Sequence, residues 1–173
     1  MKRRAEQFTP HLDRYVYAME PCQRRKTIDY GGKSGYGADI LSYVSGPVTI
    51  ADHMPGELKK VRGHETILVD FNDGFPEGMW DAAVAFEIIE HVIDPDDFVR
   101  QIKEHLNPDG AFVFSVPHMM PHESHLTLFD EKKIWELISK YFTIEEFYIQ
   151  RAYGISNKPF TKYPVTYVGI ARN

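Results

Sequence analysis

The chain has little cysteine and no long apolar run. Its 173 residues include one cysteine, Cys22, so no disulfide can form within the chain. No apolar stretch approaches the roughly 18 residues that are needed to cross a bilayer. The first four residues, Met1 to Arg4, lead into polar residues rather than into the apolar stretch of a signal peptide. We therefore expect a cytoplasmic protein that is neither a disulfide scaffold nor a membrane protein.

Positive charge is also scarce. Lysine and arginine together number 20 against 25 acidic residues, which gives a formal net charge of -5. This balance argues against a protein that binds chiefly by neutralising nucleic-acid phosphates. We expect a small or weakly charged partner, no membrane partner, and a monomer or homodimer; the same balance disfavours a nucleic-acid partner without excluding one. An apolar fraction of 43% in a chain of this length predicts one globular domain.

Apolar runs of strand length alternate with helical patterns from about residue 27 onward. Such alternation is typical of an α/β protein, in which helices cover a parallel sheet. An amphipathic helix, interrupted early by Pro10, is predicted before the first strand at residues 5–20. A further capped helix is expected to begin at Asp130. The predicted strands cover residues 26–30, 48–51, 66–69, 82–86, 111–116, about 144–150 and about 165–171.

The clearest predicted helix begins after Asp94. Asp94 can cap the helix, and Pro95 suits its first turn. The following residues 107–110, with the sequence NPDG, are predicted to form a turn. Apolar residues four positions apart predict the buried face of this helix: Phe98, Ile102 and Leu106.

Acidic residues end the first three predicted strands, where ligands of an open parallel sheet bind. Asp29 precedes a glycine-rich turn, and Asp52 lies 23 positions after Asp29. That interval is close to the one at which an acid ending the second strand binds ribose hydroxyls. The turn reads GxxxGxG instead of the GxGxxG of dinucleotide-binding proteins. Asp29 would be unfavourable beside pyrophosphate but tolerable beside a sulfonium, so the pattern favours S-adenosylmethionine over NAD.

Taken in order, these motifs resemble the class I S-adenosylmethionine-dependent methyltransferases, particularly the small type 11 group of quinone and sugar O-methyltransferases. The resemblance covers roughly residues 25–150. It implies a Rossmann-like fold with helices on both faces of a mostly parallel seven-stranded sheet, whose last strand is antiparallel. It also implies one domain, with residues 1–24 as a helical cap on a core of residues 25–173. The motifs are IDYGGKSGYG at 28–37, IAD at 50–52, LVDF at 68–71, WDAAVAFEIIEHV at 80–92, PDG at 108–110 and SVPH at 115–118.

The resemblance also implies which residues bind S-adenosylmethionine. Asp52 would hold the ribose diol, and Asp70 with Phe71 would contact the adenine. Lys33 departs from the family pattern, which usually has a third glycine there; its side chain would reach the cofactor carboxylate, point to solvent or fill the pocket and prevent binding. The complete predicted set is Asp29, Gly31, Gly32, Gly35, Asp52, His53, Asp70, Phe71, Phe86 and Glu87.

Methyl transfer to a hydroxyl needs an acceptor held behind the methyl group and is helped by a general base. A loop after the fifth strand, residues 118–125, carries three histidines. We predict His125 and His91 as the catalytic bases, and His118, His122 and Tyr15 as substrate contacts. Residues 153–163, which join the last two strands, are predicted to border the acceptor pocket through Lys158 and Phe160.

Other interpretations of the histidines remain open. His91 would orient the loop after Glu90, and His125 would pack against Phe129. The histidine loop with Glu123 could also hold a divalent metal, but the spacing does not define a coordination geometry, and we predict no metal ligand.

The leading prediction is a methyltransferase that acts on a small molecule or saccharide, most readily on a hydroxyl oxygen. The alternative is a non-catalytic binding or regulatory protein that keeps the fold, suggested by Lys33 and the short link after Asp52. A nicotinamide-dependent oxidoreductase is a third interpretation, disfavoured by the glycine spacing.

Overall fold

A computed structural model describes residues 2–151, 154–156 and 165–173 of the chain. Along these residues, no helix is both long and apolar enough to cross a membrane. The helices are α1 (Lys2–Ala18), α2 (Tyr36–Ser45), α3 (Pro55–Leu58), the short 3-10 helix η1 (Ile89–His91), α4 (Pro95–Glu104) and α5 (Glu131–Ser139). The strands are β1 (Thr27–Tyr30), β2 (Thr49–Asp52), β3 (Glu65–Leu68), β4 (Trp80–Phe86), β5 (Leu106–Pro117), β6 (Thr143–Arg151), β7 (Gly154–Ser156) and β8 (Thr166–Arg172).

The strands form one sheet in the order β3-β2-β1-β4-β5-β8-β6-β7. The first five strands in that order are parallel, and β8 runs antiparallel to both β5 and β6. The predicted α/β class, with a mostly parallel sheet and an antiparallel last strand, is confirmed. The three-residue strand β7 pairs with β6 and adds an eighth strand to the seven predicted.

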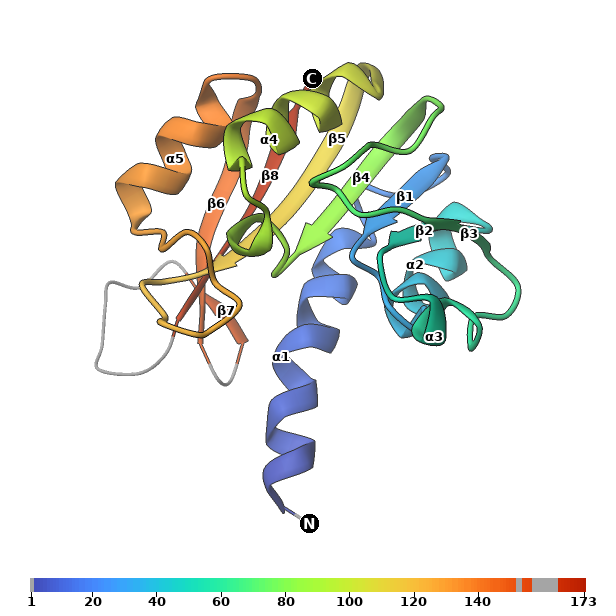
Figure 1. The fold of residues 1–173 in the computed structure, drawn as a ribbon, viewed down its shortest axis with the longest axis horizontal. Coiled ribbons are helices and arrows are strands. Elements are labelled where there is room, and N and C mark those ends of the chain that lie inside the picture. The colour runs from blue at the N-terminus through green and yellow to red at the C-terminus, as the bar shows by residue number, and fades with distance from the viewer. Residues whose placement is uncertain (1, 152–153, 157–164) are drawn as a thin grey trace.

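Helices cover both faces of the sheet, as Figure 1 shows, with α4 and α5 in front and α1 and α2 behind. Successive residues of a strand point to opposite faces. Ala83 and Ala85 of β4 accordingly join the buried cluster that contains Phe98 of α4. Val84 and Phe86 of the same strand join the cluster on the other face, with residues of α1 and α2. Apolar residues on both faces of β4 and β5 explain why these strands appear in the sequence as nearly continuous apolar runs.

The boundary between α4 and β5 differs from the prediction. The helix ends at Glu104, and Leu106 begins β5 instead of extending the helical stripe. Leu106 pairs with Trp80, whereas the next paired residue of β4, Ala82, lies opposite Ala111. Residues 107–110 therefore form a bulge within the strand, and Asp109 has a φ of 61° there. The turn-forming residues of NPDG produce a bulge because the chain continues along the same strand.

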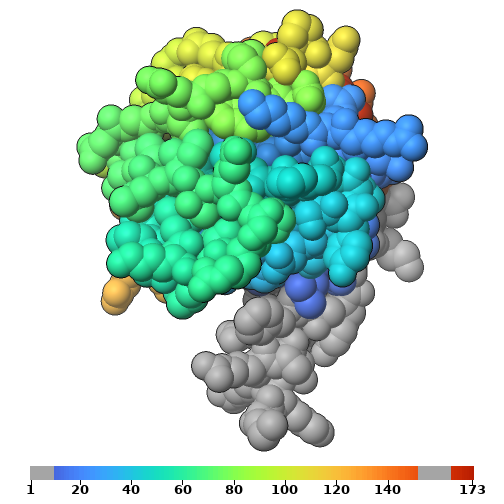
Figure 2. Space-filling model, turned by 90° about the vertical axis from the view of Figure 1, so that its right-hand side faces the viewer, coloured from blue at the N-terminus to red at the C-terminus, as the bar shows by residue number. Residues whose placement is uncertain are grey.

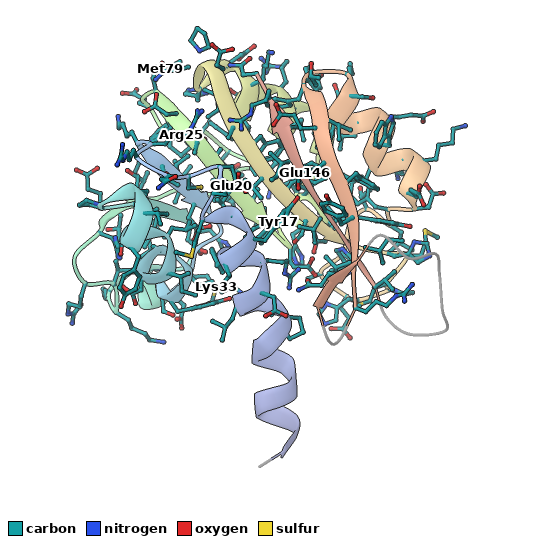
Figure 3. The ribbon with its side chains drawn as sticks, turned by 180° about the vertical axis from the view of Figure 1, so that it is seen from behind. Tyr17, Glu20, Arg25, Lys33, Met79 and Glu146 are labelled. Carbon is teal, nitrogen blue, oxygen red and sulfur yellow. The ribbon has the colours of Figure 1, made fainter. Side chains whose placement is uncertain are left out.

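The C-terminal part of helix α1 lies against the rear face of the sheet, and its N-terminal part extends beyond the edge of the sheet (Figure 3). Its Tyr17 hydroxyl donates to Oε2 of Glu146 in β6 at 2.7 Å, and the Gln150 amide donates to the Pro10 carbonyl at 2.6 Å. At the opposite end of the sheet, α2, α3 and the segments around β3 form the surface seen in Figure 2. Two further contacts, from Tyr15 to Asp29 and from Arg14 to Glu87, place the middle of α1 near the carboxyl ends of β1 and β4. The division into a cap of residues 1–24 and a core remains a prediction.

Candidate functional site

A cavity of about 390 Å³ opens at the carboxyl edge of the parallel strands. This is the edge at which open α/β sheets bind ligands. The lining combines the turn after β1, the ends of β2, β3 and β4, helix α1 and η1. Its residues are His11, Tyr15, Gly31, Gly32, Lys33, Tyr36, Asp52, His53, Met54, Asp70, Phe71, Asn72, Phe86, Glu87, Ile88, His91, Val92 and Ser124.

The glycine turn lets the backbone line the cavity closely. A Cβ atom on Gly32 would lie 2.6 Å from Oδ2 of Asp29, so only glycine fits there without movement. Lys33 has a φ of 50°, a left-handed conformation that glycine adopts more readily. The lysine thus keeps a backbone conformation suited to glycine, and its exposed side chain borders the cavity without filling it. Figure 3 shows Lys33 beside α1.

Asp52, at the end of β2, is 2% exposed yet borders the cavity. Its Oδ2 accepts a hydrogen bond from the Lys33 backbone N–H at 3.0 Å, and its Oδ1 accepts one from the Met54 N–H at 2.8 Å. His53 is exposed, with its Nδ1 3.6 Å from the Asp52 carboxylate. Asp52 therefore joins the glycine turn to the loop after β2 and offers its remaining lone pairs to the cavity.

Asp29 lies beneath the cavity and is not part of its lining. Its Oδ2 accepts a hydrogen bond from the Tyr15 hydroxyl at 3.0 Å, and Oδ1 has no partner among the described residues. Burial raises the pKa of Asp29 to about 7. Tyr15, predicted as a substrate contact, lines the cavity and packs edge-on against Phe86. A Cβ atom on Gly37 would lie 2.0 Å from the Tyr15 ring, so this glycine allows α1 to approach α2.

Asp70 and Phe71 follow β3 and form the far wall of the cavity. Asp70 Oδ1 accepts hydrogen bonds from the backbone and side-chain nitrogens of Asn72 at 3.0 and 2.9 Å. The Phe71 ring packs against Tyr30 and Phe98, with centroids 5.7 and 5.2 Å away. The core thereby holds a partly buried aromatic ring in the lining of the cavity.

Phe86, which ends β4, and Glu87, which follows it, lie on the opposite side of the cavity. Oε1 of Glu87 lies 2.6 Å from a guanidinium nitrogen of Arg14 and accepts a hydrogen bond from the Ser115 hydroxyl at 3.0 Å. Arg14 also donates to that hydroxyl at 3.0 Å. Because Arg14 is buried, this network fixes α1 to the ends of β4 and β5.

The two predicted bases lie together. The His91 and His125 rings meet edge to face, with centroids 4.8 Å apart, and His91 lines the cavity. Nδ1 of His91 lies 2.8 Å from the Ser124 carbonyl oxygen. A carbonyl only accepts, so this nitrogen carries the hydrogen and Nε2 has the lone pair. Burial lowers the pKa of His91, with a contribution from His125, and so favours the neutral ring that a base requires.

The remaining loop histidines lie farther from the cavity lining. His118 has its Nδ1 2.7 Å from the Tyr167 hydroxyl, and His122 has its Nδ1 2.8 Å from the Ser124 hydroxyl. The cavity lining also omits His125 and Gly35, which is the N-cap of α2. Lys158 and Phe160 lie outside the described residues.

Sequence reasoning missed several residues of this region, among them the ionisable residues His11, Arg14 and Glu90. His11 and Arg14 lie on α1, whose polar residues resemble those of an ordinary solvent-exposed helix face. Burial, together with Arg14 and Lys33, lowers the pKa of His11 to about 4. Glu90 is buried, and burial together with Glu87 raises its pKa to about 9. A signal for Glu90 was present, because it is the acid within the apolar run Ile88, Ile89 and Val92.

Comparisons with known proteins agree with this geometry. Residues 3–152 match the profile of a methyltransferase domain family. A probable S-adenosylmethionine-dependent methyltransferase of Mycolicibacterium smegmatis is 30% identical over 117 residues, which are 64% of this chain and 45% of the relative. The ubiquinone biosynthesis O-methyltransferase of Azorhizobium caulinodans is 25% identical over 114 residues, 61% of this chain and 45% of that protein. The chain spans about half the length of these curated relatives.

Among solved structures, the N-methyltransferase NodS of Bradyrhizobium japonicum WM9 in complex with S-adenosyl-L-homocysteine superimposes with a TM-score of 0.74. The alignment covers 95% of this chain and 88% of NodS, at 13% sequence identity. At this identity, the likeness shows a shared fold.

Proposed function

Because the chain belongs to the methyltransferase domain family, we propose that it transfers a methyl group from S-adenosylmethionine to a hydroxyl oxygen of a small molecule or saccharide. Family membership confirms two predictions: the resemblance to class I methyltransferases and S-adenosylmethionine as the cofactor. The acceptor and its hydroxyl are part of the proposal, which the O-methyltransferase among the relatives supports.

The observation that carries the proposal is that residues suited to the cofactor and residues suited to the acceptor line the same cavity from two sides. The turn after β1, Asp52 and the Asp70–Phe71 pair form one side, and Glu87 and His91 form the other. The volume of about 390 Å³ falls within the usual range of small-ligand sites. A buried carboxylate that accepts hydrogen bonds, an aromatic ring that offers a packing surface and a glycine turn suit a nucleoside with an amino-acid tail. The residues present therefore fit S-adenosylmethionine.

On this proposal, Asp52 holds the ribose diol, His53 covers the same end, and Asp70 with Phe71 contacts the adenine. Gly31, Gly32 and Gly35 shape the turn around the methionine part, supported from below by Asp29. Phe86 and Glu87 border that part from the other side. When bound, the cofactor supplies an electrophilic methyl group on a positively charged sulfur. The chain's own contribution is to position the acceptor and to exclude water.

His91 is the general base that the geometry favours. It lines the cavity, its Nε2 has the free lone pair, and its lowered pKa keeps the ring neutral. His125 lies behind it and supports the ring. His118, His122 and Tyr15 remain proposed acceptor contacts, and Tyr15 is the one of these that lines the cavity.

The non-catalytic alternative rested on Lys33 and the short link after Asp52. The cavity beside Lys33 stays open, which favours the catalytic interpretation. The test is transfer of a radiolabelled methyl group from S-adenosylmethionine to a panel of phenols, catechols and sugars. Labelled product that falls at least tenfold with His91→Ala supports the proposal. Binding of the cofactor without product on any acceptor of the panel would favour the non-catalytic alternative. Cytoplasmic location and a monomer or homodimer remain predictions.

A further inference from the structure

Three side chains next to the cavity form a cluster of a kind that binds metal ions. A carboxylate oxygen of Glu90 and one ring nitrogen each of His91 and His125 lie within 4.8 Å of one another. Glu90 and His91 belong to η1, and His125 lies in the loop before α5. The backbone N–H groups of Leu126 and Thr127 donate to the Glu90 carbonyl at 2.8 and 3.2 Å. Backbone contacts therefore hold the loop against η1 and bring His125 to the other two residues.

The imidazoles of His91 and His125 are each held through the same ring nitrogen. Nδ1 of His91 lies 2.8 Å from the Ser124 carbonyl oxygen, and Nδ1 of His125 lies 2.7 Å from the Met120 carbonyl oxygen. Each Nδ1 must carry the hydrogen, so each Nε2 has a lone pair. His91 Nε2 lies 3.8 Å from Oε1 of Glu90. A ring fixed by a backbone carbonyl through one nitrogen, with the other nitrogen free, is typical of histidines that bind metal.

The buried carboxylate of Glu90 supports a bound cation independently of the histidine geometry. It is 1% exposed, and neither carboxylate oxygen has a hydrogen-bond partner among the described residues. The nearby guanidinium of Arg14 is paired with Glu87 at 2.6 Å instead. A buried carboxylate without a partner is costly, and a bound cation is one way to offset that cost.

We propose that Glu90, His91 and His125 bind one divalent cation of the zinc type. Two imidazole nitrogens and one carboxylate oxygen suit zinc or a similar first-row metal, whereas magnesium and calcium prefer an all-oxygen shell. Three protein ligands leave a coordination position open, as in catalytic zinc sites. His91 and Ser124 line the cavity, so the cluster lies beside the space that the acceptor would occupy.

In its role, this inference rests on the proposed function: the open position would take the acceptor hydroxyl and lower its pKa, so that the hydroxyl releases its proton to solvent water and its oxygen then takes the methyl group from the sulfonium. When the cation is bound, His91 is one of its ligands and no longer acts as the general base. The site thus favours acceptors that can offer an oxygen to a metal, such as adjacent hydroxyls on an aromatic ring or on a sugar.

The test uses the whole purified chain after removal of metals with a chelator. Zinc chloride is titrated by calorimetry, and cobalt chloride is titrated by visible absorption, which reports the geometry of the ligands. We expect one equivalent of each metal to bind. Glu90→Gln, His91→Ala and His125→Ala should each weaken zinc binding at least tenfold. Their melting temperatures in chelator should stay within a few degrees of the wild type, which shows that the variants fold.

The matched control is His122→Ala, because His122 lies on the same loop but outside the cluster. It should keep one equivalent of zinc with less than a threefold change in affinity. Absence of zinc and cobalt binding at micromolar concentrations would overturn the inference, as would equal losses in His122→Ala and His125→Ala. Titration of the chelated protein with S-adenosylhomocysteine tests the proposed function separately. Binding of that compound without zinc binding contradicts the metal site alone, and zinc binding without it contradicts the proposed cofactor site alone.

Discussion

Two buried carboxylates border the same edge of the sheet in opposite states. Asp52, at the end of β2, accepts a backbone N–H bond on each oxygen. Glu90, on η1 after β4, has no partner on either oxygen among the described residues. Their exposures, 2% and 1%, are nearly the same, so burial does not explain the difference. The backbone already satisfies both oxygens of Asp52 and holds the carboxylate in place for a ligand. The carboxyl group of Glu90 needs a proton or a bound cation to offset the cost of its burial.

The largest loss of stability is expected for Gly37→Ala, which disturbs the side of the cavity that the glycine turn and Asp52 form. The added Cβ would overlap the Tyr15 ring, whose hydroxyl holds Asp29 beneath the glycine turn. We expect the free energy of unfolding to fall by about 3 kcal/mol, as measured in urea. Gly56→Ala is the control, because no heavy atom lies within 4 Å of its added Cβ. Equal stability of the two variants would show that Tyr15 is not packed as described.

An isosteric pair of variants sharpens the contrast between the carboxylates themselves. In metal-free protein at pH 7, Asp52→Asn should lower the free energy of unfolding by about 2 kcal/mol, because an amide NH₂ would face a backbone N–H. Glu90→Gln should change it by less than about 0.5 kcal/mol, since the pKa of Glu90, about 9, keeps that carboxyl neutral at this pH. Thermal and urea unfolding of both variants test this. A loss for Glu90→Gln as large as for Asp52→Asn would mean that Glu90 has a partner.

Asp29 lies between the two cases, with one oxygen bonded to Tyr15 and the other without a partner among the described residues. Its pKa of about 7 lies above the usual value of about 3.9, so the folded state holds a proton that the unfolded chain releases. Stability from this residue is therefore present below about pH 4 and is lost as the pH rises toward 7. Asp29→Asn should gain on the order of 1–2 kcal/mol relative to the wild type between pH 5 and pH 7. Urea unfolding at several pH values measures this gain, and a difference that does not vary with pH would refute it.

The smallest predicted effect concerns Lys33. Its φ of 50° is strained for lysine and free of strain for glycine. Lys33→Gly should therefore raise the free energy of unfolding by about 1 kcal/mol, whereas Lys33→Ala, which keeps a Cβ atom, should not. Chemical denaturation distinguishes these outcomes. A gain of the same size in both variants would place its origin in the lysine charge instead of the backbone.

Much of the fold could be predicted because its signals are local. Asp94 caps α4 through the N–H groups of Asp96 and Asp97, as the sequence pattern indicates, and Asp130 caps α5. The acids at the ends of β1, β2 and β3 come together because parallel strands end at one edge. The bulge at 107–110 was missed because turn residues do not show whether the chain reverses.

The candidate site was predictable only where it follows the strand ends. The Arg14–Glu87 pair joins residues 73 positions apart, and nothing on α1 marks its arginine as buried. The meeting of Glu90 with His125 likewise depends on how one loop docks on η1. Such contacts are set by tertiary packing, which a pattern of residues along the chain does not encode.

The central claim is that the cavity binds S-adenosylmethionine through Asp52. Calorimetric titration of the wild type and Asp52→Ala with S-adenosylhomocysteine, with NAD as the comparison ligand and Asp39→Asn as an exposed-acid control, tests it most directly. We predict that the wild type and Asp39→Asn bind one equivalent, that NAD does not bind, and that Asp52→Ala binds roughly 100-fold more weakly through loss of charge-assisted hydrogen bonds. Binding of S-adenosylhomocysteine by Asp52→Ala at wild-type strength would contradict the account.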